Sequence, residues 1–173
     1  MVYFLRTARL SFRCWSEGDL PLALALWGDP AVTALIGGPF TPETVRERLH
    51  RGIALMRQHG VQHWPAFLSD GAQFIGCAGL RPYRLEDGIY EFGVHLRPAF
   101  QGKGFAREAA NAIIYHAFGT LRAESLFAGH HPRNEASRRI LAKLGFVATH
   151  EELYAPTGLM HPSCLLRRPQ ALS

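Results

Sequence analysis

The sequence predicts one α/β (α+β) domain, with a mixed, mainly antiparallel central sheet of about six to seven strands flanked by helices. Of its 173 residues 47% are apolar, which suits a globular domain with its own core. Helical patterns dominate the first 60 residues, and a run of strand patterns follows. Strands and helices then alternate toward the C-terminus, which is typical of helices packed on a mixed sheet. We expect a single domain over 1–173, with its core at about 8–168.

The N-terminal third is expected to supply one strand and three helices. In chain order these are a strand at 8–15 and helices at 16–28, 31–38 and 41–60. The last helix has the clearest signals, because Thr41 can cap its start and Gly60 can end it. Its apolar face holds Val45 and Leu49, and the arginines of 46–57 are expected on a solvated face, where they could also meet an acidic substrate.

The remainder is expected to be mostly strands. Strands are predicted at 61–69, 73–82, 88–98, 124–131, 146–154 and 160–168, with helices at 104–119 and 134–145. The Asp70-Gly71 pair predicts a hairpin between the first two of these strands. Within 88–98, Glu91 and His95 share one side, opposite Phe92 and Leu96.

Composition limits the partners and the compartment. The net charge of +5 without a Lys/Arg run gives no support for nucleic acid, and no apolar run is long enough to span a membrane. Cys14, Cys77 and Cys164 form no CxxC pair, so buried reduced thiols in a cytoplasmic protein are expected. Histidines such as His130 and His131 form no closed ligand set, so no metal is expected. A monomer or a homodimer fits the sequence.

The segment from Gln101 to Arg107 has the features of an anion site. The helix expected from Gly104 has no Ser, Thr, Asp or Asn to cap its first N–H groups. Gly102 and Gly104 allow a tight turn and close approach of a ligand, while Lys103 and Arg107 add positive charge. These features favour a phosphate ligand, and a glycine loop that binds only water is the alternative.

The motifs around this loop point to a family. The P-loop and dinucleotide patterns both fail, because Gly104 is not followed by Lys-Ser/Thr and position 107 is arginine. The pattern that fits is Q-x-x-G-x-A, preceded by "EFGVHLRP" and followed by "HPRNEASRRILAKLGF". With the opening "RLSFRCWSEGDLPLALALWGDP", these motifs resemble the GNAT N-acetyltransferase superfamily over nearly the whole chain. The branch they resemble acetylates N-terminal amines of ribosomal proteins.

The resemblance implies acetyl-CoA as cosubstrate and an amine as acceptor. It assigns the coenzyme A pyrophosphate to the loop residues Gln101, Gly102, Lys103, Gly104, Phe105 and Ala106, with Arg107 close by. It assigns the pantetheine arm to Val94, His95 and Leu96, one of whose N–H groups would polarise the thioester carbonyl. Asn134 would also contact the pantetheine while capping its own helix.

The resemblance also implies direct attack of the amine on the thioester. Glu91 is the expected general base, and His95, on the same side, is expected to pack rather than react. Relatives often place a tyrosine where this chain has Leu141, so Ser137 or a water is expected to protonate the leaving thiolate.

Three matters stay open at this point. The chain could be a catalytically inactive sensor or partner protein that binds acetyl-CoA or coenzyme A, or a nucleotide-cofactor domain. The acceptor could be a protein N-terminus, a free amino acid, a polyamine-like amine or an aminoglycoside-type drug.

Overall fold

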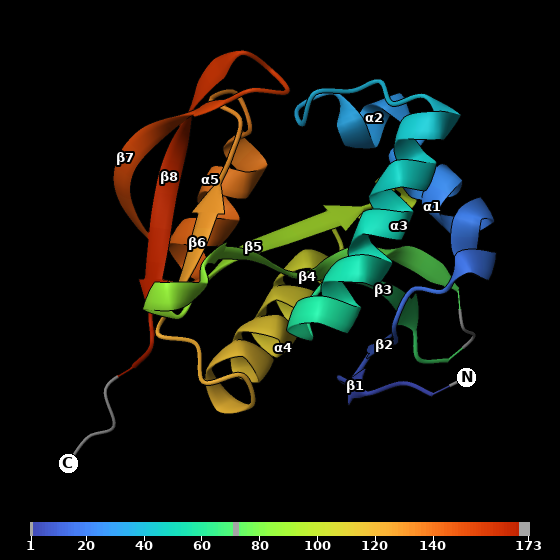
Figure 1. Cartoon of the computed structure of the whole chain (residues 1–173), viewed down its shortest axis with the longest axis horizontal. Helices are drawn as coiled ribbons and strands as arrows, with labels where there is room; N and C mark the ends of the chain where they lie inside the picture. Colours follow the sequence, from blue (N-terminus) through green and yellow to red (C-terminus); the bar gives the residue numbers. More distant parts are fainter. Residues whose placement is uncertain (1, 71–72, 170–173) are drawn as a thin grey trace.

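The computed structural model describes residues 2–70 and 73–169 and contains one eight-stranded sheet (Figure 1). The strands are β1 (Leu5–Arg6), β2 (Leu10–Phe12), β3 (His63–Leu68), β4 (Phe74–Arg84), β5 (Ile89–Leu96), β6 (Ser125–Gly129), β7 (Val147–Tyr154) and β8 (Leu159–Arg167). They lie in the order β1-β2-β3-β4-β5-β6-β8-β7. The predicted fold class is confirmed, and the predicted strand count was slightly low because the two-residue β1 carries no readable period.

Helices cover both faces of this sheet. The α-helices are α1 (Leu20–Trp27), α2 (Pro30–Thr33), α3 (Pro42–His59), α4 (Phe105–Gly119) and α5 (Glu135–Lys143), and single 3₁₀ turns occupy Glu17–Asp19, Leu85–Asp87 and Pro98–Phe100. α4 packs Ala109 and Ile113 into one buried apolar cluster. α1 and α3 form a second cluster, to which α3 contributes Val45 and Leu49. None of the described helices is long and apolar enough to cross a membrane.

The sheet opens at its centre, and this opening positions the site. Every neighbouring pair is antiparallel except β5 and β6, which run parallel. Their register joins Ile89 to Ser125, Tyr90 to Leu126 and Glu91 to Phe127. Both strands continue beyond these pairs, to Leu96 and Gly129, without pairing to each other in the described residues. Figure 1 shows the result as two strand groups, with β6, β7 and β8 turned away from β5.

Local signals account for the ends of α3. The Oγ1 atom of Thr41 accepts a hydrogen bond from the Thr44 N–H at 3.2 Å. Gly60 adopts φ +70°, and its N–H donates to the Met56 carbonyl at 3.0 Å. Both predicted ends are therefore confirmed, because each depends on one residue with a specific capping geometry.

Other predicted boundaries shifted. The opening strand is only Leu10–Phe12, because Arg13 would next face Pro65, which has no N–H to donate, and a capping turn begins at Ser16. The predicted helix at 16–28 accordingly divides into a 3₁₀ turn and α1. The hairpin predicted at Asp70-Gly71 includes residues 71–72, which lie outside the described residues. All three cysteines are free, but Cys14 is exposed rather than buried as expected.

Candidate active site

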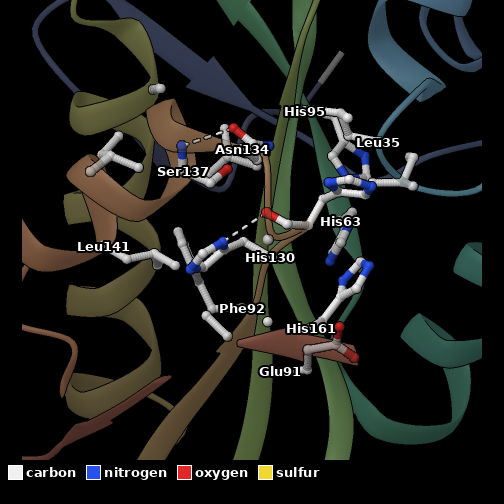
Figure 2. A pocket seen from close by; sticks show the side chains of 18 of the residues that line it. Leu35, His63, Glu91, Phe92, His95, His130, Asn134, Ser137, Leu141 and His161 are labelled. Atoms are coloured by element: carbon white, nitrogen blue, oxygen red, sulfur yellow. Dashed lines mark hydrogen bonds between the residues drawn. The ribbon is translucent and has the colours of Figure 1, made fainter. Parts of the chain in front are cut away.

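A cavity of about 770 Å³ occupies the opening between β5 and β6. Gly102, Asn134 and Ser137 line it from the side of α4 and α5, and Leu35 and Arg48 line it from the side of α2 and α3. Figure 2 shows Asn134, Ser137 and Leu141 on one side, across from His63, His95 and Leu35. Elements on both faces of the sheet therefore line the cavity.

The start of α4 forms one end of this cavity. Gly104 is the N-cap with φ +80°, and no side chain caps the helix. Gly102 also has a left-handed φ of +70° and, like Gly104, lines the cavity. Because the first N–H groups of a helix have no internal acceptor, this end of the cavity presents donors and the positive end of a helix dipole. It is suited to bind an anion such as phosphate.

Residues outside the motif hold this loop in place. Arg9 donates from Nη1 to the Lys103 carbonyl at 3.1 Å and pairs through Nε with Glu108 at 2.6 Å. The guanidinium of Arg9 also lies over the Phe105 ring, 4.5 Å from its centre. Nothing in the motif indicated Arg9, which is nearly a hundred positions away in the sequence. The loop shape therefore depends on a contact that only the fold creates.

The residues from Gln101 to Arg107 differ in whether they line the cavity. Gln101 donates from Nε2 to the Leu96 carbonyl at 3.0 Å and so ties the loop to β5. Lys103 donates from Nζ to the Ala99 carbonyl at 2.8 Å, so its ammonium is engaged locally. Gln101, Gly102, Gly104 and Ala106 line the cavity, whereas Lys103, Phe105 and Arg107 are not among its described lining residues.

The free edge of β5 faces the opening. The Arg97 N–H donates toward β4, to the Ile75 carbonyl at 2.9 Å. Since successive N–H groups of a strand point to opposite sides, the N–H groups of Val94 and Leu96 point away from β4 and into the opening, while that of His95 points toward β4. Two of the three residues expected along the pantetheine therefore offer free backbone donors.

The start of α5 lies across from this edge. The Oδ1 atom of Asn134 accepts the Ser137 N–H at 3.0 Å, so Asn134 is an N-cap as expected. Asn134, Ser137 and Leu141 all line the cavity (Figure 2). Leu141 is buried and apolar, so it supplies no proton donor to the cavity.

Glu91 and His95 reach the cavity in different states. The carboxylate of Glu91 pairs with Arg81 at 2.6 Å. Nδ1 of His95 accepts a hydrogen bond from Trp27 Nε1 at 3.1 Å, so this nitrogen carries no proton. Burial, with the nearby positive charges of Arg48 and Arg81, lowers the pKa of His95 to about 3. His95 is thus a neutral packing residue near pH 7.

His63 is a cavity residue whose setting comes from two glycines. The sheet register places His63 opposite Gly79 on β4, and Gly79 opposite Gly93 on β5. A Cβ added to Gly93 would lie 2.7 Å from His63 Cε1, so only glycine leaves room for the ring. His63 Nε2 is buried without a partner, and burial lowers the pKa of the imidazole well below its usual value. The paired glycines were the sequence signal, but the register that aligns them was not readable.

The arginines of α3 do not all face solvent as expected. Arg48 lines the cavity and stacks over two rings, 5.2 Å from the centre of Trp27 and 4.9 Å from that of Phe40. It directly precedes Leu49, at the border of the buried face of α3, and Phe40 covers it. The prediction of a solvated position was therefore wrong for Arg48.

One group of side chains has the distances between potential ligand atoms that a metal site needs, but not the chemistry. Potential ligand atoms of His63, Cys77 and His95 lie within 4.8 Å of one another. Burial raises the pKa of Cys77 to about 12, so this sulfur holds its proton. Arg48 and Arg81 add positive charge, which lowers the pKa of both imidazoles. The donor set therefore does not favour a cation, and a site without metal stays our prediction.

Comparison with known proteins identifies the family of the chain. Residues 9–147 match the family model for the acetyltransferase (GNAT) domain. This match covers most of the chain, so the chain belongs to the GNAT acetyltransferase family.

Related proteins and structures agree with this assignment. The chain is 28% identical to the uncharacterized N-acetyltransferase p20 of Bacillus licheniformis, over 82% of this chain and 81% of that protein. It is also 28% identical to the uncharacterized protein YkkB of Bacillus subtilis (strain 168), over 82% and 83%. The structure of an acetyltransferase from Agrobacterium tumefaciens str. C58 superposes with a TM-score of 0.82, at 23% identity over 97% of this chain and 98% of that one. That of the ribosomal-protein-S5-alanine acetyltransferase of Vibrio fischeri does so with a TM-score of 0.73, at 23% identity over 96% and 97%.

Proposed function

We propose that this protein transfers the acetyl group of acetyl-CoA to a primary amine, of a protein N-terminus or a small molecule, by direct attack. The observation that carries the proposal is the cavity between β5 and β6. It joins an uncapped helix N-terminus, suited to phosphates, to a second approach beside α2 and α3. Two substrates can thus meet from opposite faces of the sheet.

The donor occupies the side of α4 and α5. Its pyrophosphate accepts hydrogen bonds from the N–H groups at the start of α4, around Gly102 to Ala106. Its pantetheine arm lies along the free edge of β5, where Val94 and Leu96 offer N–H donors, and contacts Asn134. This placement is supported by the left-handed glycines at 102 and 104 and by the open edge of β5.

The reaction is a single displacement through a tetrahedral intermediate. The neutral amine nitrogen attacks the thioester carbon, and the new C–N bond forms as the carbonyl π electrons move to oxygen. The N–H of Val94 stabilises this oxyanion. The C–S bond then breaks, the amine proton passes to Glu91 directly or through one water, and the thiolate of coenzyme A leaves.

Protonation of the leaving thiolate falls to Ser137 or a water. Ser137 lines the cavity beside Asn134, and Leu141 offers no donor. A thiol has a pKa of about 8.5, so its thiolate is a weak base and can leave without a strong acid. The reaction therefore does not require the tyrosine that this chain lacks.

The proposal is tested by incubating the protein with acetyl-CoA and a panel of amines. The panel includes peptides with free N-termini, free amino acids, polyamines and aminoglycosides. We expect free coenzyme A thiol and acetylated product in equal amounts for at least one class, measured by thiol titration and mass spectrometry. Tight binding of acetyl-CoA without product from any amine would contradict catalysis and support a sensor or partner role.

A further inference from the structure

Among the described residues, Arg48 is the charged residue of the cavity wall without an ion-pair partner. Among the charged residues that line the described cavity, Arg81 pairs with Glu91 at 2.6 Å, and Glu152 contacts His150 at 2.8 Å. Within the described residues, Arg48 makes no ion pair, and its buried Nε has no hydrogen-bond partner. A guanidinium carries five N–H donors, so an unpaired one in a cavity wall calls for an acceptor.

The guanidinium of Arg48 is held in position before any ligand binds. It lies over the rings of Trp27 and Phe40, and Trp27 is itself fixed by its hydrogen bond to His95. Stacking on aromatic rings orients the plane of a guanidinium without using its N–H groups. Arg48 is therefore oriented, partly desolvated and still free to donate, which strengthens its interaction with an anion.

Arg48 lies on the acceptor side of the reacting carbon. Arg48 and His63 line the cavity together, and the His63 ring rests against Gly93. Gly93 directly precedes Val94, whose N–H we place at the thioester carbonyl. The anion loop of α4, in contrast, reaches the cavity from the other face of the sheet.

We propose that the acceptor is an amine that also carries a carboxylate, and that Arg48 binds this carboxylate in the cavity wall beside α3. The proposal rests on the proposed function and narrows its substrate class. A planar carboxylate matches the two-pronged geometry of one guanidinium. A doubly charged phosphate would need a second cation to balance its charge. The neighbouring Arg81 is already paired with Glu91, so a carboxylate fits this site better.

Two sources of such a carboxylate can be separated by matched acceptors. One pair is a free amino acid and its amide, with kcat/KM expressed per neutral amine because the two amines differ in pKa. The other pair is two C-terminally amidated peptides that differ by glutamate or glutamine at the second position. We expect kcat/KM to favour the carboxylate form of at least one pair by about 10- to 100-fold, the range of a charge-assisted hydrogen bond.

Variants assign this preference to Arg48. Arg48→Gln should remove the preference while leaving the KM for acetyl-CoA unchanged, and Arg48→Lys should retain part of it. Arg46→Gln is the matched control, because Arg46 is an exposed arginine on the same helix outside the cavity. Thermal unfolding of each variant verifies that it is folded, and Arg48→Lys keeps the test decisive if Arg48→Gln does not fold.

The outcomes separate this inference from the proposed function. Equal kcat/KM for both members of each pair, or an unchanged preference in Arg48→Gln, would overturn the inference and leave acetyl transfer intact. Absence of product from every acceptor would overturn the proposed function, and the inference with it.

Discussion

His63 and His95, on the wall of the cavity, are expected to affect the stability of the protein rather than its catalysis. Burial and the positive charges nearby lower the pKa of His95 to about 3 and that of His63 well below its usual value. The lone pair of His95 Nδ1 is used by Trp27, so protonation of this nitrogen would also break a hydrogen bond. Both side chains are therefore neutral in the folded protein. In the unfolded protein their pKa returns to about 6.5, so they take up protons below this pH.

We predict that the protein loses stability as the pH falls below about 6.5. Below this pH the unfolded state binds protons that the folded state does not bind. The free energy of unfolding therefore falls with pH until the pKa of the folded state is reached, which is about 3 for His95. Each histidine should contribute up to about 1.4 kcal/mol per pH unit. Urea denaturation at about pH 7.0, 6.0 and 5.5 measures this loss. His95→Gln should reduce the slope, and His63 should contribute to what remains, together with His116 and His161, whose pKa values burial also lowers. A pH-independent free energy over this range would refute neutral buried histidines.

Glu91 is the residue that we assign to the transfer of the amine proton. Glu91→Gln keeps the shape of the side chain but cannot accept a proton, so kcat should fall by about 100-fold or more, and the pH dependence of kcat should change. The dissociation constant for acetyl-CoA should stay the same. Glu152→Gln, which removes the other carboxylate of the cavity wall, is the control. A wild-type pH profile in Glu91→Gln would exclude Glu91 as the base.

At the scale of elements, the start of α4 is predicted to bind the pyrophosphate. Gly104→Asp would bring a negative charge to the helix N–H groups at a position with φ +80°. We expect the KM for acetyl-CoA to rise about 10- to 100-fold. Gly158→Asp is matched for backbone strain, since Gly158 has φ +68° and open surroundings in the turn between β7 and β8. Equal KM values in the two variants would remove the phosphate role of the loop.

His63, Gly79 and Gly93 lie in a row across three neighbouring strands, and Gly93 leaves room for the His63 ring. Gly93→Ala would place its Cβ 2.7 Å from His63 Cε1, so the ring must shift within the cavity. We predict a loss of about 1–3 kcal/mol in the free energy of unfolding, together with lower kcat/KM. In a His63→Ala background the same change should cost little, because the clash is gone. An equal cost in both backgrounds would show that the two residues are not coupled.

Sequence patterns predicted the elements wherever one residue determines the local geometry. α3 was located to within a residue, because Thr41 and Gly60 each have a definite capping role. The expected lack of a side-chain cap at Gly104 is likewise confirmed, and the anion site inferred from it stays a prediction. β1 was missed, since two residues carry no period, and the opening strand was overextended because its pairing ends where Arg13 would face Pro65.

The rest of the candidate site depends on contacts that are distant in sequence. Arg9 reaches the loop from almost a hundred positions away, and His63 faces Gly93 only through the register of three strands. Arg48 was misjudged because Phe40 and Trp27 cover it. A sequence motif identifies residues whose positions are set by nearby residues in the chain. It gives no information on residues that only the fold brings to the site.

At the scale of the whole molecule, the proposed function depends on the separation of β5 and β6 in the sheet. β5 and β6 pair only from Ile89 to Glu91 on β5, and the cavity fills the space beyond. One face of the sheet brings the uncapped α4 to this space, and the other brings α3 with Arg48. We propose that the acetyl group crosses this opening directly from coenzyme A to an amine.

The most direct test follows an isotopically labelled acetyl group from acetyl-CoA in the wild-type protein. Intact-protein and product mass spectra are recorded with and without an amine acceptor. We predict that the label appears on the amine nitrogen of the acceptor and that the enzyme itself stays unlabelled when the acceptor is withheld. Label retained on the enzyme, or label on no amine although acetyl-CoA binds, would contradict direct transfer.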